Sequence, residues 1–127
     1  MKKYLLPHIL IISFIFLLAP TAHVATYAGE IEDAREEVRN NPDDAEAHYN
    51  LGIAYSKLGK YKEAIESFKQ AIRLNPNYVD AHFLLGVAYI GIKDRDSALE
   101  QYRILKRLNS DEKANFLFNG INNYSQR

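Results

Sequence analysis

Apolar residues recur with helical periodicity through the middle of the chain, in two series separated by a short polar break. The first series is Leu51, Ile53, Ala54, Tyr55 and Leu58, and the second is Tyr61, Ala64, Ile65, Phe68, Ala71 and Ile72. A spacing of three or four residues places such side chains on one side of an α-helix. Gly59 suits the left-handed backbone that ends a first helix, and Pro76 cannot continue a second one. The pattern therefore predicts two antiparallel helices joined by a tight turn.

The same pattern returns further along the chain at a constant offset. The segment AHYNLGIAY at residues 47–55 matches AHFLLGVAY at residues 81–89. Further downstream, the pairs matched at the same offset are Ala64 and Ala98, Glu66 and Glu100, Arg73 and Arg107, Leu74 and Leu108, and Asn75 and Asn109. A constant offset of this size is typical of arrays in which one helix pair stacks on the next. We therefore expect two copies of the helix pair to share one core.

These positions resemble the tetratricopeptide repeat family, whose 34-residue pattern places an aromatic residue, Leu-Gly, Tyr, Ala, Phe, Ala and Pro at fixed offsets. Residues 45–78 supply His48, Leu51, Gly52, Tyr55, Ala64, Phe68, Ala71 and Pro76, and residues 79–112 supply His82, Leu85, Gly86, Tyr89, Ala98 and Tyr102. The small Gly52 and Ala64 allow close helix packing, and Phe68 fills the space beside them. Leu105 and Ser110 stand where the family prefers Ala and Pro, so we expect a looser junction after the second repeat.

Half-repeats flank this pair. Residues 30–41 carry one apolar stripe and predict a lone helix that corresponds to the second helix of a repeat, which we call a second-type helix. Residues 111–124 predict a closing helix that corresponds to the first helix of a repeat, a first-type helix. The sequence thus predicts an all-α fold, a short α-solenoid of antiparallel helix pairs with five or six helices. The expected divisions are residues 1–28 (signal peptide), 29–42 (N-terminal capping helix), 43–78 (first repeat), 79–112 (second repeat) and 113–127 (C-terminal capping helix and tail).

The N-terminus has the composition of an export signal. Lys2 and Lys3 precede an uncharged apolar run over residues 9–19, and small residues at Thr26 and Ala28 predict cleavage after Ala28. The alternative is an uncleaved anchor over residues 4–19, although this segment is shorter than the roughly 20 residues of a membrane-spanning helix. Cleavage would leave 14 Lys and Arg against 16 Asp and Glu. Such a balance offers no electrostatic attraction to nucleic acid.

The family resemblance implies that the first helix of each repeat lines a concave face. The residues expected there are Tyr49, Asn50, Ile53, Phe83, Leu84, Val87, Ile90, Leu117, Phe118 and Ile121. This face is mostly apolar and aromatic, and large exposed apolar patches usually mark contact sites. The alternative is self-burial, because helical spacing alone does not separate core from groove. Some family members hold a C-terminal carboxylate with paired Lys and Asn; Tyr49 and Ile53 occupy those positions here, which favours an apolar peptide or helix instead.

The residues that could carry chemistry have structural explanations. His48 and His82 lie one repeat apart, but both occupy the position of the packed aromatic residue of the family. The chain has no cysteine, which excludes a thiol nucleophile and any Cys-based zinc site. No phosphate-binding loop or nucleophile–base motif is present, so we predict no enzyme activity, no cofactor, no metal and no small-molecule substrate.

The sequence therefore predicts a non-catalytic protein-interaction module, acting as an adaptor or assembly factor in the cell envelope. Its partner would be another exported or membrane protein, and the chain itself would contact a membrane only if the signal is uncleaved. The expected location is the periplasm or the extracellular space. The alternative is a structural subunit that self-associates through the same groove as a homo-oligomer.

Overall fold

The computed structural model describes residues 24–124, and these residues form six α-helices and no strand. The first helix occupies residues 24–40. It is followed by α2 (Ala45–Lys57), α3 (Tyr61–Leu74), α4 (Val79–Gly91), α5 (Arg95–Arg107) and α6 (Asp111–Tyr124). The predicted anchor over residues 4–19, most of the predicted signal peptide and the tail from residue 125 lie outside the described residues. Within those residues, no helix is long and apolar enough to cross a membrane.

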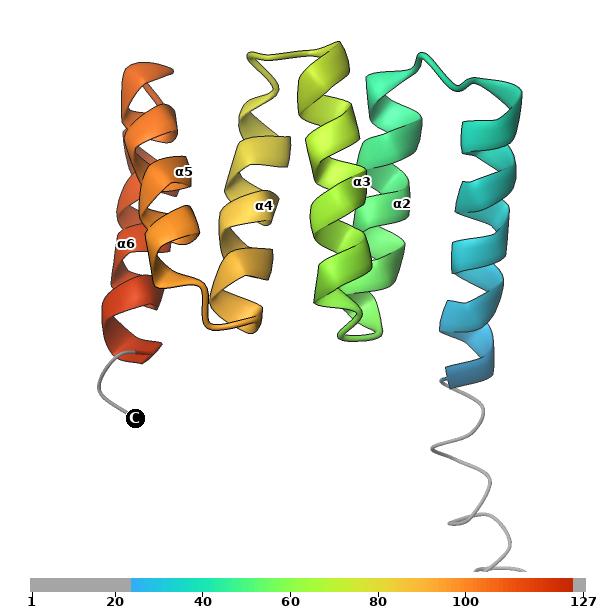
Figure 1. Ribbon diagram of the computed structural model, residues 1–127, viewed down its shortest axis with the longest axis horizontal. Coiled ribbons are helices and arrows are strands. Elements are labelled where there is room, and N and C mark those ends of the chain that lie inside the picture. Colours follow the sequence, from blue (N-terminus) through green and yellow to red (C-terminus); the bar gives the residue numbers. More distant parts are fainter. Residues whose placement is uncertain (1–23, 125–127) are drawn as a thin grey trace, which may run out of the picture.

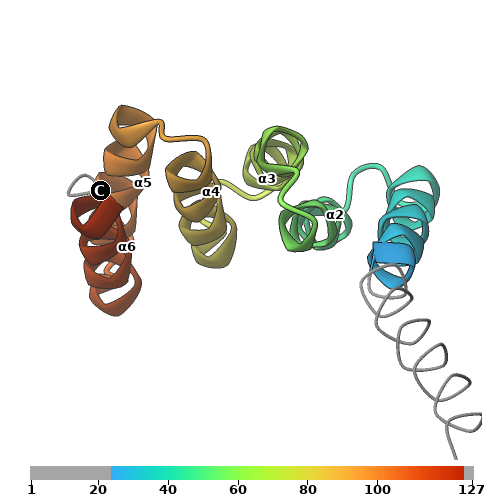
Figure 2. The ribbon, with the colours of Figure 1, turned by 90° about the horizontal axis from the view of Figure 1, so that it is seen from below.

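The helices stack as antiparallel neighbours in one curved array (Figure 1). Seen from below, α2, α4 and α6 form one row, and α3 and α5 form a second row above it in the picture (Figure 2). Each helix from α2 onwards contacts the next one, and α4 also contacts both α2 and α6. The predicted all-α solenoid is therefore confirmed. The first helix already includes residues 24–29, ahead of the expected start at residue 30, and it therefore continues through the predicted cleavage position after Ala28.

Polar caps and left-handed residues set the helix ends. The Asp44 carboxylate accepts a hydrogen bond from the backbone N–H of Glu46 at 3.0 Å at the start of α2, and Asp94 accepts one from Ser97 at 3.1 Å at the start of α5. Both satisfy backbone donors that have no partner within the helix. Gly59 follows α2 with a φ of 69°, as predicted, and Lys93 takes the same conformation after α4 with a φ of 65°.

The core divides into two clusters on either side of α4. The first surrounds Phe68, which is fully buried against Gly52, and includes Tyr55 and Ile65. The second contains Ala98, Leu105, Ala114, Leu117 and Ile121. Half-buried residues of α4 pack on both clusters, Leu84 on the first and Phe83 on the second. The apolar α4 therefore joins the two repeats into one folded unit.

The junction before α6 is shorter than the repeat predicts. Helix α2 begins at Ala45 and α4 at Val79, one full repeat apart, but α6 already begins at Asp111, two positions before the next repeat would place it. The connection between α5 and α6 covers only positions 108–110, and Asn109 among them adopts a left-handed φ of 56°. The expectation of a looser junction is wrong, because Leu105 is fully buried in the second cluster and the connection is tight. Since each residue turns a helix by about 100°, a shift of two residues turns the side chains of α6 by about 200°.

Candidate functional site

Half-buried apolar side chains cross the row formed by α2, α4 and α6. They are Tyr49 and Ile53 on α2 and Phe83, Leu84 and Ile90 on α4, each packed against one of the core clusters. Val87 on α4 is more open, with 37% of its surface exposed. We call these residues, together with Phe116 of α6, the apolar strip. Because its members rest on the core and also reach the surface, the strip offers a partner apolar contact area on a rigid base.

Phe116 belongs to the strip although the sequence did not indicate it. Its ring lies 5.8 Å from the ring of Phe83, measured between centroids, with an edge-to-face angle of 64°. It is also 68% exposed, the most exposed large apolar side chain among the described residues. Favourable ring geometry thus coexists with a large area open to solvent. The absence of the family's Pro at position 110, which allowed a shorter junction, was the one signal that could have revealed this residue.

Three predicted groove residues of α6 lie elsewhere. Leu117 and Ile121 are 1% and 2% exposed and belong to the second core cluster, so their expected place on an open face is wrong. A Cβ atom built on Gly86 would lie 2.5 Å from Cδ2 of Leu117, which shows how closely Leu117 packs on α4. Phe118 is 39% exposed but packs on Tyr102 of α5, with 5.2 Å between the ring centroids. The two-residue shift of α6 explains all three differences.

Tyr49 anchors the strip on α2. Its ring lies 4.9 Å from that of Tyr78 and 5.9 Å from that of Phe68. Burial raises the pKa of the Tyr49 phenol above its usual 10.0, and the negative charge of Asp80 raises this pKa further. The hydroxyl is therefore neutral at physiological pH and can donate a hydrogen bond to a bound peptide.

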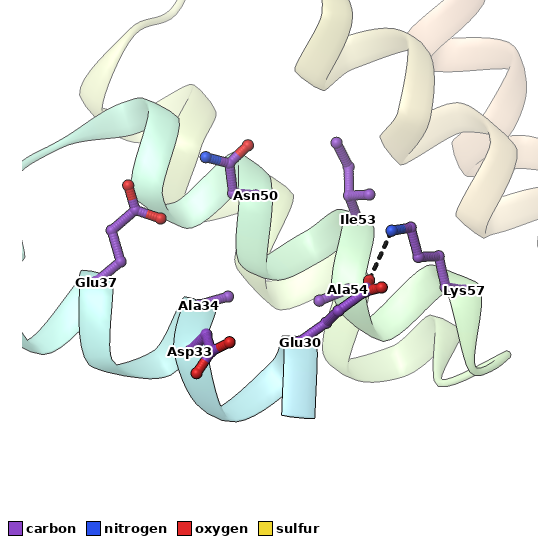
Figure 3. A pocket seen from close by; sticks show the side chains of 8 residues that line it. All are labelled: Glu30, Asp33, Ala34, Glu37, Asn50, Ile53, Ala54 and Lys57. Atoms are coloured by element: carbon purple, nitrogen blue, oxygen red, sulfur yellow. Dashed lines mark hydrogen bonds and ion pairs between the residues drawn. The ribbon is translucent and has the colours of Figure 1, made fainter. Parts of the chain in front are cut away.

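Asn50 and Ile53 also line a cleft of about 350 Å³ between the first helix and α2. Its other walls are Glu30, Asp33, Ala34, Glu37, Ala54 and Lys57 (Figure 3). Nζ of Lys57 lies 2.6 Å from Oε2 of Glu30 and 6.0 Å from the ring centroid of Tyr27. The cleft thus has three carboxylates and one ammonium group on its walls, and it joins the apolar strip at Ile53.

The two histidines support the loops rather than an open site. Nε2 of His48 lies 2.8 Å from the carbonyl oxygen of Pro42, and Nε2 of His82 lies 2.8 Å from that of Pro76. His82 is buried, and its Nδ1 also lies 2.8 Å from Oε1 of Gln101 on α5. This repeated contact ties α2 and α4 each to the loop before it, which supports the predicted packing role. In the part of the chain that the structure describes, no three metal-ligating side chains gather at one place.

Comparison with known protein families matches two tetratricopeptide repeat models, one over residues 45–78 and the other over residues 67–107. Among proteins of curated function, no sequence matches this chain.

Several solved structures share the fold. The TPR2B domain of yeast Sti1, solved as a complex with pHsp70, has 24% sequence identity and a TM-score of 0.73, and the match covers 86% of this chain and 91% of that one. The second TPR domain of human RPAP3, bound to the HSP70 peptide SGPTIEEVD, has 24% identity, a TM-score of 0.71 and coverage of 91% and 98%. MamA of Desulfovibrio magneticus RS-1 has 26% identity and a TM-score of 0.64, and the match covers 72% of this chain and 51% of that one.

The internal repeat, the stacked helix pairs and these matches all indicate the same repeat architecture. The chain belongs to the tetratricopeptide repeat family.

Proposed function

We propose that this chain is a non-catalytic protein-binding module whose apolar strip holds an apolar helix or extended peptide of another exported or membrane protein. The observation that carries the proposal is the strip itself, which crosses α2, α4 and α6 and leaves Phe116 68% exposed. A soluble protein that exposes such a side chain beside other apolar groups gains free energy when a partner covers it.

The yeast neighbour is solved as a complex with pHsp70 and the human neighbour with an HSP70 peptide, which supports peptide binding in general. The chemistry of the ligand differs here. Tyr49 and Ile53 occupy the positions at which family members that grip a C-terminal carboxylate carry Asn and Lys, and an apolar surface cannot compensate a carboxylate charge. The partner segment should therefore contact the strip through its side chains.

The binding test compares three forms of the chain: wild type, Phe116→Glu and Phe118→Glu. Both substitutions place the same charge on α6, but only Phe116 lies beside Phe83. Immobilised chain is exposed to the exported proteins of its own cell, and retained proteins are identified by mass spectrometry. We expect at least one protein to be retained by both wild type and Phe118→Glu but not by Phe116→Glu. Identical retention by all three forms, with equal helicity, would refute the role of the strip.

We further propose that the module acts in the cell envelope as an adaptor or assembly factor, in the periplasm or the extracellular space. The basic start, the apolar run over residues 9–19 and the small residues before Gly29 support export. The intact mass of the protein recovered after export tests this step. A mass that begins at Gly29 is expected, and a mass that begins at Met1 would indicate a module anchored by residues 4–19.

The alternative function is a self-associating subunit, and the outer face of α6 favours it because Phe118 and Tyr124 are 39% and 46% exposed. Two copies could cover these rings and the strip together. Light scattering over a range of concentrations separates the two functions. A dimer that Phe116→Glu disrupts would support self-association, whereas a monomer at all concentrations would exclude it.

A further inference from the structure

The cleft beside the first helix occupies the place of a first-type helix. In the complete repeat, α3 packs on α2, with the ring of Phe68 against Gly52. The helix over residues 24–40 is of the second type, like α3, and it precedes α2 as α3 precedes α4. The described residues hold no first-type helix on its other side. One face of this helix, together with the neighbouring side of α2, therefore forms an open cleft of about 350 Å³.

The residues on this face differ from those of α3 in a consistent way. Counted back by one repeat, Ala64, Ser67 and Ala71 of α3 correspond to Glu30, Asp33 and Glu37. In α3 these three small residues are buried. In the first helix the same positions carry carboxylates that line the cleft (Figure 3). An apolar helix seated there would remove three carboxylates from water with only Lys57 to compensate their charge, which is strongly unfavourable.

The charges of the cleft are only partly compensated. Lys57 pairs with Glu30 at 2.6 Å. Across the described part of the chain, the carboxylates of Asp33 and Glu37 have no ion-pair partner. Ile53 and Ala54 provide an apolar floor beside them, and Asn50 adds an amide. The cleft thus has two carboxylates available for a cation next to an apolar surface.

We propose that the cleft receives a Lys or Arg side chain at one end of the partner segment, while the apolar part of the same segment lies on the strip over α4 and α6. This inference rests on the proposed function and adds the chemistry and direction of the ligand. Ile53 belongs to both surfaces, so one continuous segment can contact them.

The test uses two synthetic amphipathic peptides with the same Leu-rich face, one with two Arg residues at one end and the other with two Gln residues there. Affinities are measured by fluorescence anisotropy for wild type, for the double variant Asp33→Asn/Glu37→Gln and for Glu36→Gln. Glu36 lies on the same helix but does not line the cleft, so Glu36→Gln controls for the loss of a carboxylate outside the cleft.

For wild type we expect the Arg peptide to bind about three- to tenfold more tightly than the Gln peptide, the size expected for two partly solvated ion pairs. The ratio should fall to about one in the double variant, remain unchanged in Glu36→Gln and decrease in 1 M salt, where the screening length is about 3 Å. A ratio that the double variant leaves intact overturns the proposal. The variant Phe116→Glu tests the strip separately, because it should weaken the binding of both peptides equally. If Phe116→Glu binds both peptides as tightly as wild type does, the proposed function of the strip fails, whatever the ratio between the peptides.

Two other occupants of the cleft would show themselves in the same experiments. A preference for Arg that appears only after the signal is removed would mean that the chain's own N-terminal segment fills the cleft. A dimer that exists without peptide and is lost in Asp33→Asn/Glu37→Gln would identify a second copy as the occupant. Either result overturns the proposal.

Discussion

The substitution Gly52→Ala tests how closely α2 and α3 pack. A Cβ atom at this position would lie 2.5, 2.7 and 2.9 Å from Cε1, Cδ1 and Cζ of Phe68. The obstacle is one side of a rigid ring that is fully buried, so it cannot move aside as the tip of a flexible chain would. Overpacking of this kind costs about 1–3 kcal/mol, and we expect the upper end of this range. The higher helix propensity of Ala returns about 1 kcal/mol.

The free energy of unfolding should therefore fall by about 2 kcal/mol, which corresponds to roughly 8–16 °C in the melting temperature of a domain of this size. Urea unfolding followed by circular dichroism at 222 nm measures the change, and the slope with urea concentration should stay constant. Gly29→Ala is the matched control, since a Cβ atom there meets nothing within 4 Å; it should leave stability equal or raise it by up to about 1 kcal/mol. Gly52→Ala with wild-type stability would refute the close packing.

Three further substitutions test local features. Lys93→Gly should stabilise the fold by about 0.5–1 kcal/mol, because Lys93 has a left-handed φ of 65° that disfavours a Cβ atom; an unchanged urea midpoint would contradict this strain. The raised pKa of Tyr49, due to burial and then to Asp80, contributes stability below about pH 10 that is lost as pH rises through the raised value. Tyr49→Phe should therefore lose less stability than wild type between pH 9 and about pH 11, and an equal loss would exclude the effect. The hydroxyl and N–H of Ser97 lower the pKa of Asp94 below 3.8, so the contribution of this cap to the free energy of unfolding is present above about pH 4 and is lost as pH falls further. Asp94→Asn should therefore make the free energy of unfolding depend less on pH in acid. A pH dependence equal to that of wild type would argue against the cap.

Much of the fold follows from the periodic pattern alone. The predicted closing helix over residues 111–124 coincides with α6, and the left-handed Gly59 and the contact of Phe68 with Gly52 were also foreseeable. These features are local, or they depend on residues repeated at a constant offset, so the same side-chain sizes lead to the same contacts in each copy.

The binding surface was harder to predict. Five of the expected groove residues on α2 and α4 are half-buried against the core: Tyr49, Ile53, Phe83, Leu84 and Ile90. Helical periodicity places such residues on one side of a helix, but it does not tell how far the neighbouring helices cover them. The acidic cleft was missed for a related reason, since Glu30, Asp33 and Glu37 fit an ordinary solvated helix face when the sequence is read alone.

The sequence by itself determined the helices, their pairing and the small residues at which they meet, because these depend on local periodicity and on a repeat of constant length. Only the tertiary structure decided which face of α6 is buried. Helix α6 begins two residues earlier than the repeat predicts, and a rotation of about 200° places Leu117 and Ile121 in the core and leaves Phe116 exposed. The length of a loop depends on how the flanking helices pack, and for this reason the open surface of the last helix could not be derived from the repeat alone.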